Sequence, residues 1–131
     1  MYTLKEKNVY KVKDLNDLRL HLITDRSLFK KQKYFFNAVE AALMGGVKAL
    51  QLREKDLPDS ELIKLGIHLR TLTSNYEAKL IINSRADIAQ KISADGVHLA
   101  EISPKANEIK SSSPDLIIGV STHSLEGAHL A

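Results

Sequence analysis

The chain contains no cysteine, and it has only three prolines in 131 residues. Without cysteine there are no disulfide bonds, thiolate nucleophiles or thiolate metal sites, so a metal ion would need oxygen or imidazole ligands. No apolar run approaches the roughly 20 residues that span a bilayer, and residues 1–13 are studded with lysine. These absences predict a cytoplasmic protein that makes no contact with a membrane.

Aromatic side chains and excess charge are also scarce. Aromatic residues make up 5% of the chain, and the formal net charge is +3. A nucleic-acid-binding protein would concentrate its basic residues in a stripe with interleaved aromatics, whereas the lysines here are scattered. We therefore expect no nucleic-acid partner. A site for phosphorylated small molecules explains a mildly basic chain equally well.

What the chain does contain is the pattern of an α/β fold. Hydrophobic residues make up 44% of the sequence and charged residues 27%, which is typical of a folded soluble domain. Short β-branched or leucine-rich runs alternate with segments of helical periodicity, as in parallel βαβ units. Residues 1–17 are predicted to be an N-terminal extension, and residues 18–131 one domain. The predicted strands cover residues 18–24, 47–53, 79–83, 96–99 and 116–120.

Helix boundaries are marked by proline, glycine and serine. A helix that begins after Pro58 places a leucine every three or four residues on one face, which is expected to pack on the sheet. The preceding helix ends at Gly45 and Gly46, which suit a left-handed cap. Ser103 and Pro104 are expected to open a later helix.

Two architectures fit five such units: an open doubly wound sheet and part of a closed barrel. Periodicity alone does not choose between them. The first predicted strand is followed by Asp25, Arg26 and Ser27 instead of a glycine-rich phosphate-binding turn. A dinucleotide-binding fold therefore loses its main support.

The strongest local signal for function lies at the end of the second predicted strand. Gln51 and Arg53 are two positions apart and share a face, and Lys55 begins the following loop. An amide and two cations at the carboxyl end of a parallel strand suit phosphate or pyrophosphate oxygens. The alternative is a solvated cluster in which these cations pair with Glu54 and Asp56.

Two further loops carry weaker signals. Asn83 follows the third strand, and its residue type favours a local turn over a ligand contact. Ser121 and His123 follow the fifth strand near a helix N-terminus, where they suit phosphate contact and acid/base catalysis, or His123 is a surface residue beside a Ser124 cap. His98 lies in an apolar run and is interpreted as a hydrogen-bonded core residue.

Five ordered segments resemble the thiamin phosphate synthase/TenI family. They read, in order, LITDR, GGVKALQLREKD, IINSRADIA, ADGVHLA and IIGVSTHSLEGA. The set is specific, although each segment alone would be weak. The resemblance implies a TIM (β/α)₈ barrel, of which this chain covers about the first five strand–helix units as an incomplete barrel with a parallel sheet.

The resemblance implies one of two reactions. The synthase branch joins a hydroxymethylpyrimidine pyrophosphate to a thiazole phosphate in a Mg²⁺-dependent reaction that releases pyrophosphate. The TenI branch aromatises a thiazole carboxylate phosphate tautomer. By this resemblance, the substrate-binding residues are Gln51, Arg53, Lys55, Asn83 and Ser121, and the catalytic acid/base of a tautomerase is His123.

The departures from the family pattern concern the metal. Ser84 and Ser103 stand where synthases have Mg²⁺-binding aspartates, and Ala100 and Glu101 also differ from the synthase pattern. We therefore expect a TenI-type thiazole tautomerase that needs no cofactor, with His123 transferring the proton. The alternatives are a thiamin phosphate synthase whose Mg²⁺ site is rescued by Glu101 and water, and a non-catalytic truncated fragment or pseudoenzyme.

The expected partners follow from the same resemblance. They are a phosphorylated thiazole and, for the synthase alternative, a pyrimidine pyrophosphate. Closed barrels need about 200 residues or more, so five units are expected to leave two strand edges unpaired and an inner face partly bare. We therefore expect a homo-oligomer.

Overall fold

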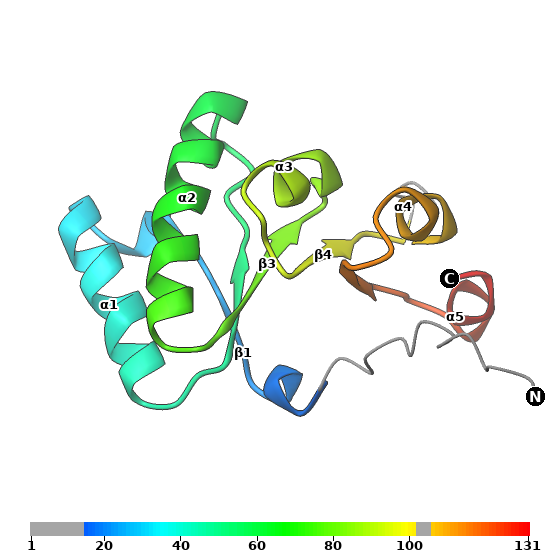
Figure 1. Ribbon diagram of the computed structural model, residues 1–131, viewed down its shortest axis with the longest axis horizontal. Helices are drawn as coiled ribbons and strands as arrows, with labels where there is room; N and C mark the ends of the chain where they lie inside the picture. Colours follow the sequence, from blue (N-terminus) through cyan, green and yellow to red (C-terminus); the bar gives the residue numbers. More distant parts are fainter. Residues whose placement is uncertain (1–14, 102–105) are drawn as a thin grey trace, which may run out of the picture.

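The computed structural model describes residues 15–101 and 106–131, in which strands and helices alternate (Figure 1). The predicted extension over residues 1–17 falls mostly outside these ranges and stays a prediction. The strands are β1 (His21–Ile23), β2 (Ala49–Leu52), β3 (Lys79–Asn83), β4 (Gly96–Leu99) and β5 (Ile117–Val120). The helices are α1 (Gln32–Met44), α2 (Asp59–Asn75), α3 (Ala86–Lys91), α4 (Ala106–Ser112) and α5 (Leu125–Leu130), with short 3₁₀ turns η1 (Leu15–Leu18) and η2 (Arg26–Leu28).

All five predicted strands are confirmed, and the largest difference concerns the first. The prediction began at Leu18, but Leu18 ends η1 and β1 begins at His21. Among the described residues, β1 pairs with β2 alone, through three residue pairs that start at His21 and Ala49, and these pairs define the three-residue strand.

The sheet topology decides between the two architectures that the sequence allowed. The strand order is β1-β2-β3-β4-β5, and every pair is parallel. A doubly wound sheet reverses its strand order at a switch point, whereas a barrel adds each strand beside the previous one. The chain therefore has the strand order of a (β/α) barrel, and its sheet is not closed among the described residues.

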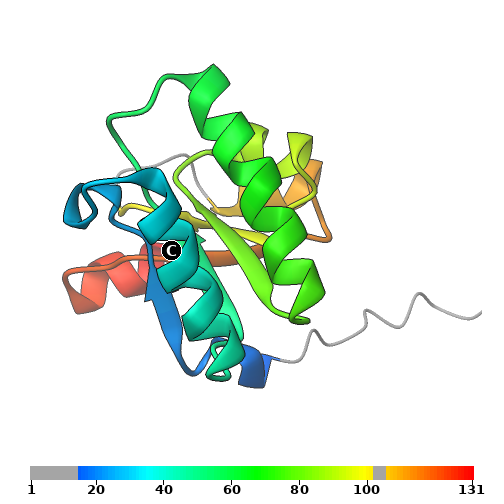
Figure 2. The ribbon, with the colours of Figure 1, turned by 90° about the vertical axis from the view of Figure 1, so that its left-hand side faces the viewer.

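The core lies between this sheet and the helices. In Figures 1 and 2, α1 and α2 lie side by side against one side of the sheet. Because strand side chains alternate between faces, every second strand residue packs on the helices. The largest fully buried side chains of this layer are those of Phe35, Leu50, Leu52, Leu69, Leu80, Ile82, Ile88, Val97 and Leu99.

The helix ends follow the predicted capping residues where the structure describes them. Gly46 adopts the left-handed conformation, with φ of 104°, whereas Gly45 is still right-handed at the end of α1. Ser124 caps α5 by accepting a hydrogen bond of 2.9 Å from the backbone N–H of Gly127. The predicted helix start at Ser103 and Pro104 lies outside the described residues. Every helix within the described ranges is too short or too polar to cross a bilayer.

Candidate functional site

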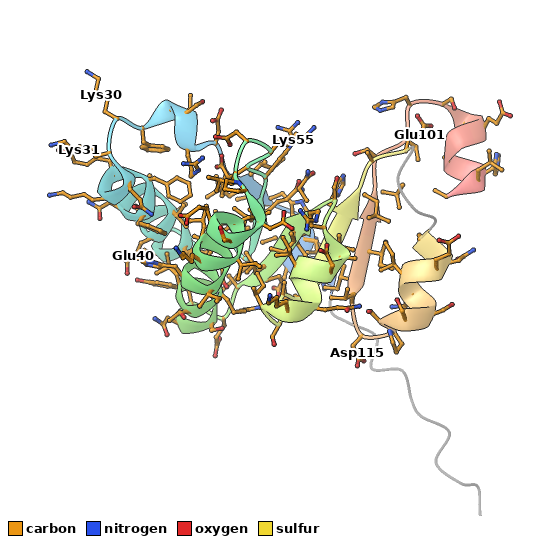
Figure 3. All side chains as sticks on the ribbon, turned by 90° about the horizontal axis from the view of Figure 1, so that it is seen from above. Lys30, Lys31, Glu40, Lys55, Glu101 and Asp115 are labelled. Atoms are coloured by element: carbon orange, nitrogen blue, oxygen red, sulfur yellow. The ribbon has the colours of Figure 1, made fainter. Side chains whose placement is uncertain are left out.

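The predicted site residues gather at one edge of the sheet. Parallel strands bring their carboxyl ends together, so the loops after β1 to β5 all open on that edge. Figure 3 shows Lys55 and Glu101 at this edge and Asp115, which precedes β5, at the opposite one. Residues that are far apart in the sequence therefore line one rim.

Arg26, and not Arg53 or Lys55, pairs with the two acidic residues of the β2–α2 loop. Its backbone N–H donates to Glu54 Oε1 at 2.8 Å, and its guanidinium lies 3.5 Å from Glu54 Oε2 and 3.0 Å from Asp56 Oδ2. Within the described ranges, Arg53 and Lys55 form no ion pair. The alternative in which these two cations pair with Glu54 and Asp56 is therefore wrong.

The two unpaired cations line a hollow between the loops that follow β1 and β2. Its volume is about 410 Å³. A neighbouring hollow of about 220 Å³ also contains Lys55, together with Asn83 and Ser84 from the end of β3. Lys55 therefore lies between Arg53 and the β3 loop. The first hollow is lined by Thr24, Asp25, Arg26, Ser27, Arg53, Glu54, Lys55 and Asp56.

Gln51 is positioned by hydrogen bonds of its backbone, and its side-chain amide forms no hydrogen bond with the described residues. The residue is 3% exposed, and its carbonyl accepts a hydrogen bond of 2.9 Å from the N–H of Thr24. The hydroxyl of Thr24 in turn accepts from the N–H of Arg53 at 3.0 Å. No described group bonds the Gln51 side chain. Thr24 thus ties β1 to the end of β2, a role that sequence reasoning missed although the residue lies in the first resembling segment.

The end of β3 forms the local turn that the sequence favoured. The Asn83 amide donates to the hydroxyl of Ser84 at 3.3 Å. Ser84 has a positive φ of 61°, and its N–H donates to the carbonyl of His98 at 2.8 Å. Asn83 is half-buried beside Lys55, and its bond to Ser84 uses one N–H, which leaves the second N–H and the amide oxygen for a ligand.

Arg85 fastens this turn to the neighbouring helices. Its guanidinium contacts both carboxylate oxygens of Asp59, at 2.6 and 2.8 Å, and both oxygens of Asp87, at 3.0 and 2.8 Å. The hydrogen bonds from Arg85 lower the pKa of each of these carboxyl groups. Arg85 is therefore neutralised in place and is not a free cation of the site.

Ser121 is positioned by His98, which lies in an apolar run of the sequence. His98 Nε2 lies 2.8 Å from Ser121 Oγ, so the interpretation of His98 as a hydrogen-bonded residue is confirmed. It is half-buried, however, and its partner is a predicted site residue. Gly119, its register partner on β5, leaves room for the ring because a Cβ there would lie 2.8 Å from Nδ1. Burial, and secondarily the charge of His21, lowers the pKa of His98.

His123 lies at the same rim but apart from the two hollows. Its side chain is exposed, and its backbone N–H donates to Glu101 Oε1 at 3.2 Å. The neighbouring Ser124 caps α5, which agrees with the alternative of a surface histidine beside a helix cap. Its catalytic role stays a prediction.

The described residues form no ready-made cluster of metal-binding side chains. No group of three His, Asp or Glu side chains comes together among them. Ser84 supplies a hydroxyl that bonds Asn83, and the carboxylate of Glu101 accepts from the backbone of His123. Mg²⁺ prefers carboxylate oxygens. Ser103, which also stands in place of an aspartate, lies outside the described residues.

Comparison with known proteins identifies relatives over most of the chain. The sequence model of a family described as thiamine monophosphate synthase matches residues 20–131. A protein of Aquifex aeolicus named "Putative thiamine-phosphate synthase 2" is 48% identical over 113 residues, which are 86% of this chain and 60% of that protein. A thiamine-phosphate synthase of Clostridium acetobutylicum is 41% identical over 115 residues, with coverages of 86% and 53%.

A solved structure agrees with the fold. The thiamine phosphate pyrophosphorylase from Pyrococcus furiosus superposes with a TM-score of 0.78 at 40% identity, over 87% of this chain and 55% of that one. The chain therefore spans between about half and three-fifths of the length of these relatives.

Proposed function

The chain belongs to the thiamine monophosphate synthase family, and from this we propose that it carries the pyrophosphate-binding part of a thiamine-phosphate synthase. The substrates would be a hydroxymethylpyrimidine pyrophosphate and a thiazole phosphate. The names of the relatives support this reading over the tautomerase that we expected from the sequence.

The observation that carries the proposal is the charge distribution around the larger hollow. Arg26 pairs with both Glu54 and Asp56, so neither carboxylate pairs with Arg53 or Lys55, and these two cations are available to a ligand. The planar fork of an arginine and the point charge of a lysine together suit the oxygens of a pyrophosphate. Gln51 lies on the same face of β2 as Arg53, but it is 3% exposed and lines neither hollow, so its contact with a ligand stays a prediction.

These groups suit the chemistry of a leaving pyrophosphate. As the new C–N bond forms to the thiazole, the bond from the pyrimidine methylene carbon to the pyrophosphate oxygen breaks, and negative charge builds on the leaving group. Cations already in place stabilise this charge without reorganisation. In the proposal, Arg53 and Lys55 supply this stabilisation.

Titration calorimetry with inorganic pyrophosphate tests this proposal. We expect Arg53→Ala and Lys55→Ala each to weaken binding by about tenfold, the worth of one charge-assisted contact. Lys30→Ala is the matched control, since Lys30 is an exposed lysine that lines neither hollow. If Lys30→Ala weakened binding as much as Lys55→Ala, the affinity would reflect net charge alone and the proposal would fail.

The TenI-type tautomerase is the second candidate. It is supported by Ser84 and Ser103 in place of the family's aspartates and by the exposed imidazole of His123 at the rim. Turnover of the thiazole carboxylate phosphate tautomer that His123→Ala abolishes and His129→Ala leaves intact would favour it. A chain that binds pyrophosphate but catalyses neither reaction would be the non-catalytic protein that the sequence also allowed.

A further inference from the structure

Two side chains from the end of β4 reach across to the loop between β5 and α5. His98 contacts the hydroxyl of Ser121, and Glu101 accepts the backbone N–H of His123, 22 positions later. Figure 3 shows Glu101 beside the start of α5. The first contact belongs to the candidate site, whereas the second involves a residue that departs from the family pattern.

Gly127 makes the position of Glu101 possible. A Cβ at Gly127 would overlap Glu101 Oε1, so the carboxylate occupies the space that a larger residue in the first turn of α5 would fill. The hydroxyl of Ser124 bonds the N–H of the same glycine. The Glu101 carboxylate therefore packs against the first turn of α5, in the space that Gly127 leaves open.

Apolar packing does little to hold α5. The helix has six residues, none of them buried, and Leu125 and Leu130 are 77% and 78% exposed. An element with little apolar burial depends on its polar contacts for order, and a hydrogen bond to a charged acceptor is stronger than one between neutral groups.

We propose that Glu101 is a positioning residue that fastens the β5–α5 loop to the end of β4. It fixes the backbone of His123 and, through the shared loop, the direction in which Ser121 continues from β5. The relevance of this loop to a substrate rests on the proposed function, but the contact itself does not.

Hydrogen exchange of the His123 amide, followed by NMR on the 131-residue chain without ligand, tests the proposal. We expect Glu101→Ala to accelerate this exchange by about tenfold, because it removes the acceptor. Glu101→Gln keeps an acceptor oxygen and is expected to stay within about threefold of the original chain. Glu108→Ala, which removes an exposed carboxylate from α4, is the matched control and should leave the rate unchanged.

Gly127→Ala supplies an independent route to the same contact. Alone, it should displace the carboxylate and accelerate exchange at His123 as Glu101→Ala does. Combined with Glu101→Ala, it should add little, because the overlapping group is already gone. Full additivity of the two substitutions would overturn the proposal, as would a His123 rate that Glu101→Ala leaves within about twofold.

Hydrogen exchange of the amide of Ile82, a fully buried residue of β3, distinguishes release of the β5–α5 loop from unfolding of the whole chain. If Glu101→Ala accelerated Ile82 equally, the variant would be globally unstable. The proposal would then be tested by comparing the exchange rate of the His123 amide in Glu101→Gln with the rate in Gly127→Ala. Equal rates in those two variants would contradict it. Pyrophosphate takes no part in this experiment, so a failure of the proposed function leaves its outcome intact.

Discussion

Arg26 determines which charged side chains at the carboxyl ends of β1 and β2 are paired. It pairs with both Glu54 and Asp56 and thereby leaves Arg53 and Lys55 without acidic partners among the described residues. Glu54 is only 8% exposed, and a buried carboxylate is costly unless it is paired. The pairing therefore has a structural cause, and the availability of the two cations follows from it.

At the residue scale, His98 should make stability depend on pH. Its pKa lies below the ordinary value of 6.5 because burial disfavours the imidazolium, and the charge of His21 adds to this. The unfolded chain therefore binds more protons, so the contribution of His98 is fully present above about pH 6.5 and is lost as the pH falls through the lowered pKa.

Urea unfolding at about pH 7.5 and about pH 5 measures this effect. We expect the unfolding midpoint to fall at the lower pH, and to fall less in His98→Asn, which does not titrate in this range. His129→Asn, which replaces an exposed histidine on α5, should behave as the original chain does. A pH dependence that is the same in all three proteins would assign it to other groups.

At the scale of elements, close approach of strands depends on single glycines. Gly96 lies on β4, between β3 and β5. It is the register partner of Ile81 on β3 and of Ile117 on β5. A Cβ at this position would lie 2.5 Å from the carbonyl oxygen of Ile117 and 2.9 Å from the side chain of Ile81. The carbonyl belongs to the neighbouring backbone and cannot rotate away.

We expect Gly96→Ala to lower the free energy of unfolding by about 2 kcal/mol or more, since β4 and β5 would have to separate. Chemical denaturation measures the change. Gly45→Ala is the control, because Gly45 is right-handed and the nearest atom to an added Cβ is 3.3 Å away, so its effect should stay within about 1 kcal/mol. Similar losses for both variants would mean that the strand spacing tolerates a methyl group.

At the scale of the whole molecule, the described sheet has two edges. β1 and β5 each pair with one neighbour, and Ile23 on β1 is 51% exposed. Unpaired strand edges with apolar side chains favour association with another chain. Self-association of this chain, which we expected from the sequence, is therefore a prediction that the open sheet supports.

Sedimentation velocity over a range of concentrations tests this prediction. We expect the 131-residue chain to associate, and Ile23→Lys to shift it toward monomer by placing a charge beside the edge. Ile67→Lys is the matched control, because Ile67 is 54% exposed on α2, away from the strand edges, and its substitution should leave association unchanged. A monomer at every concentration would rule out the homo-oligomer.

The sequence by itself determined the elements and suggested part of the candidate site. The strands and the principal helices follow from local apolar periodicity, and Gln51 and Arg53 were predicted to act together because side chains two positions apart share a face of a strand. Local chemistry was also sufficient for the glycine cap at Gly46, where φ is positive.

Only the tertiary structure decided how these parts combine. The strand order, which separates a barrel from a doubly wound sheet, depends on which strands pair and not on how each one forms. Arg26 reaches Glu54 across 28 positions and His98 reaches Ser121 across 23, so neither partnership leaves a local pattern in the sequence. The pairing of the charged groups around Arg26 and the position of the Ser121 hydroxyl depend on contacts between distant segments. Such contacts exist only once the parallel strands have brought their carboxyl ends to one edge.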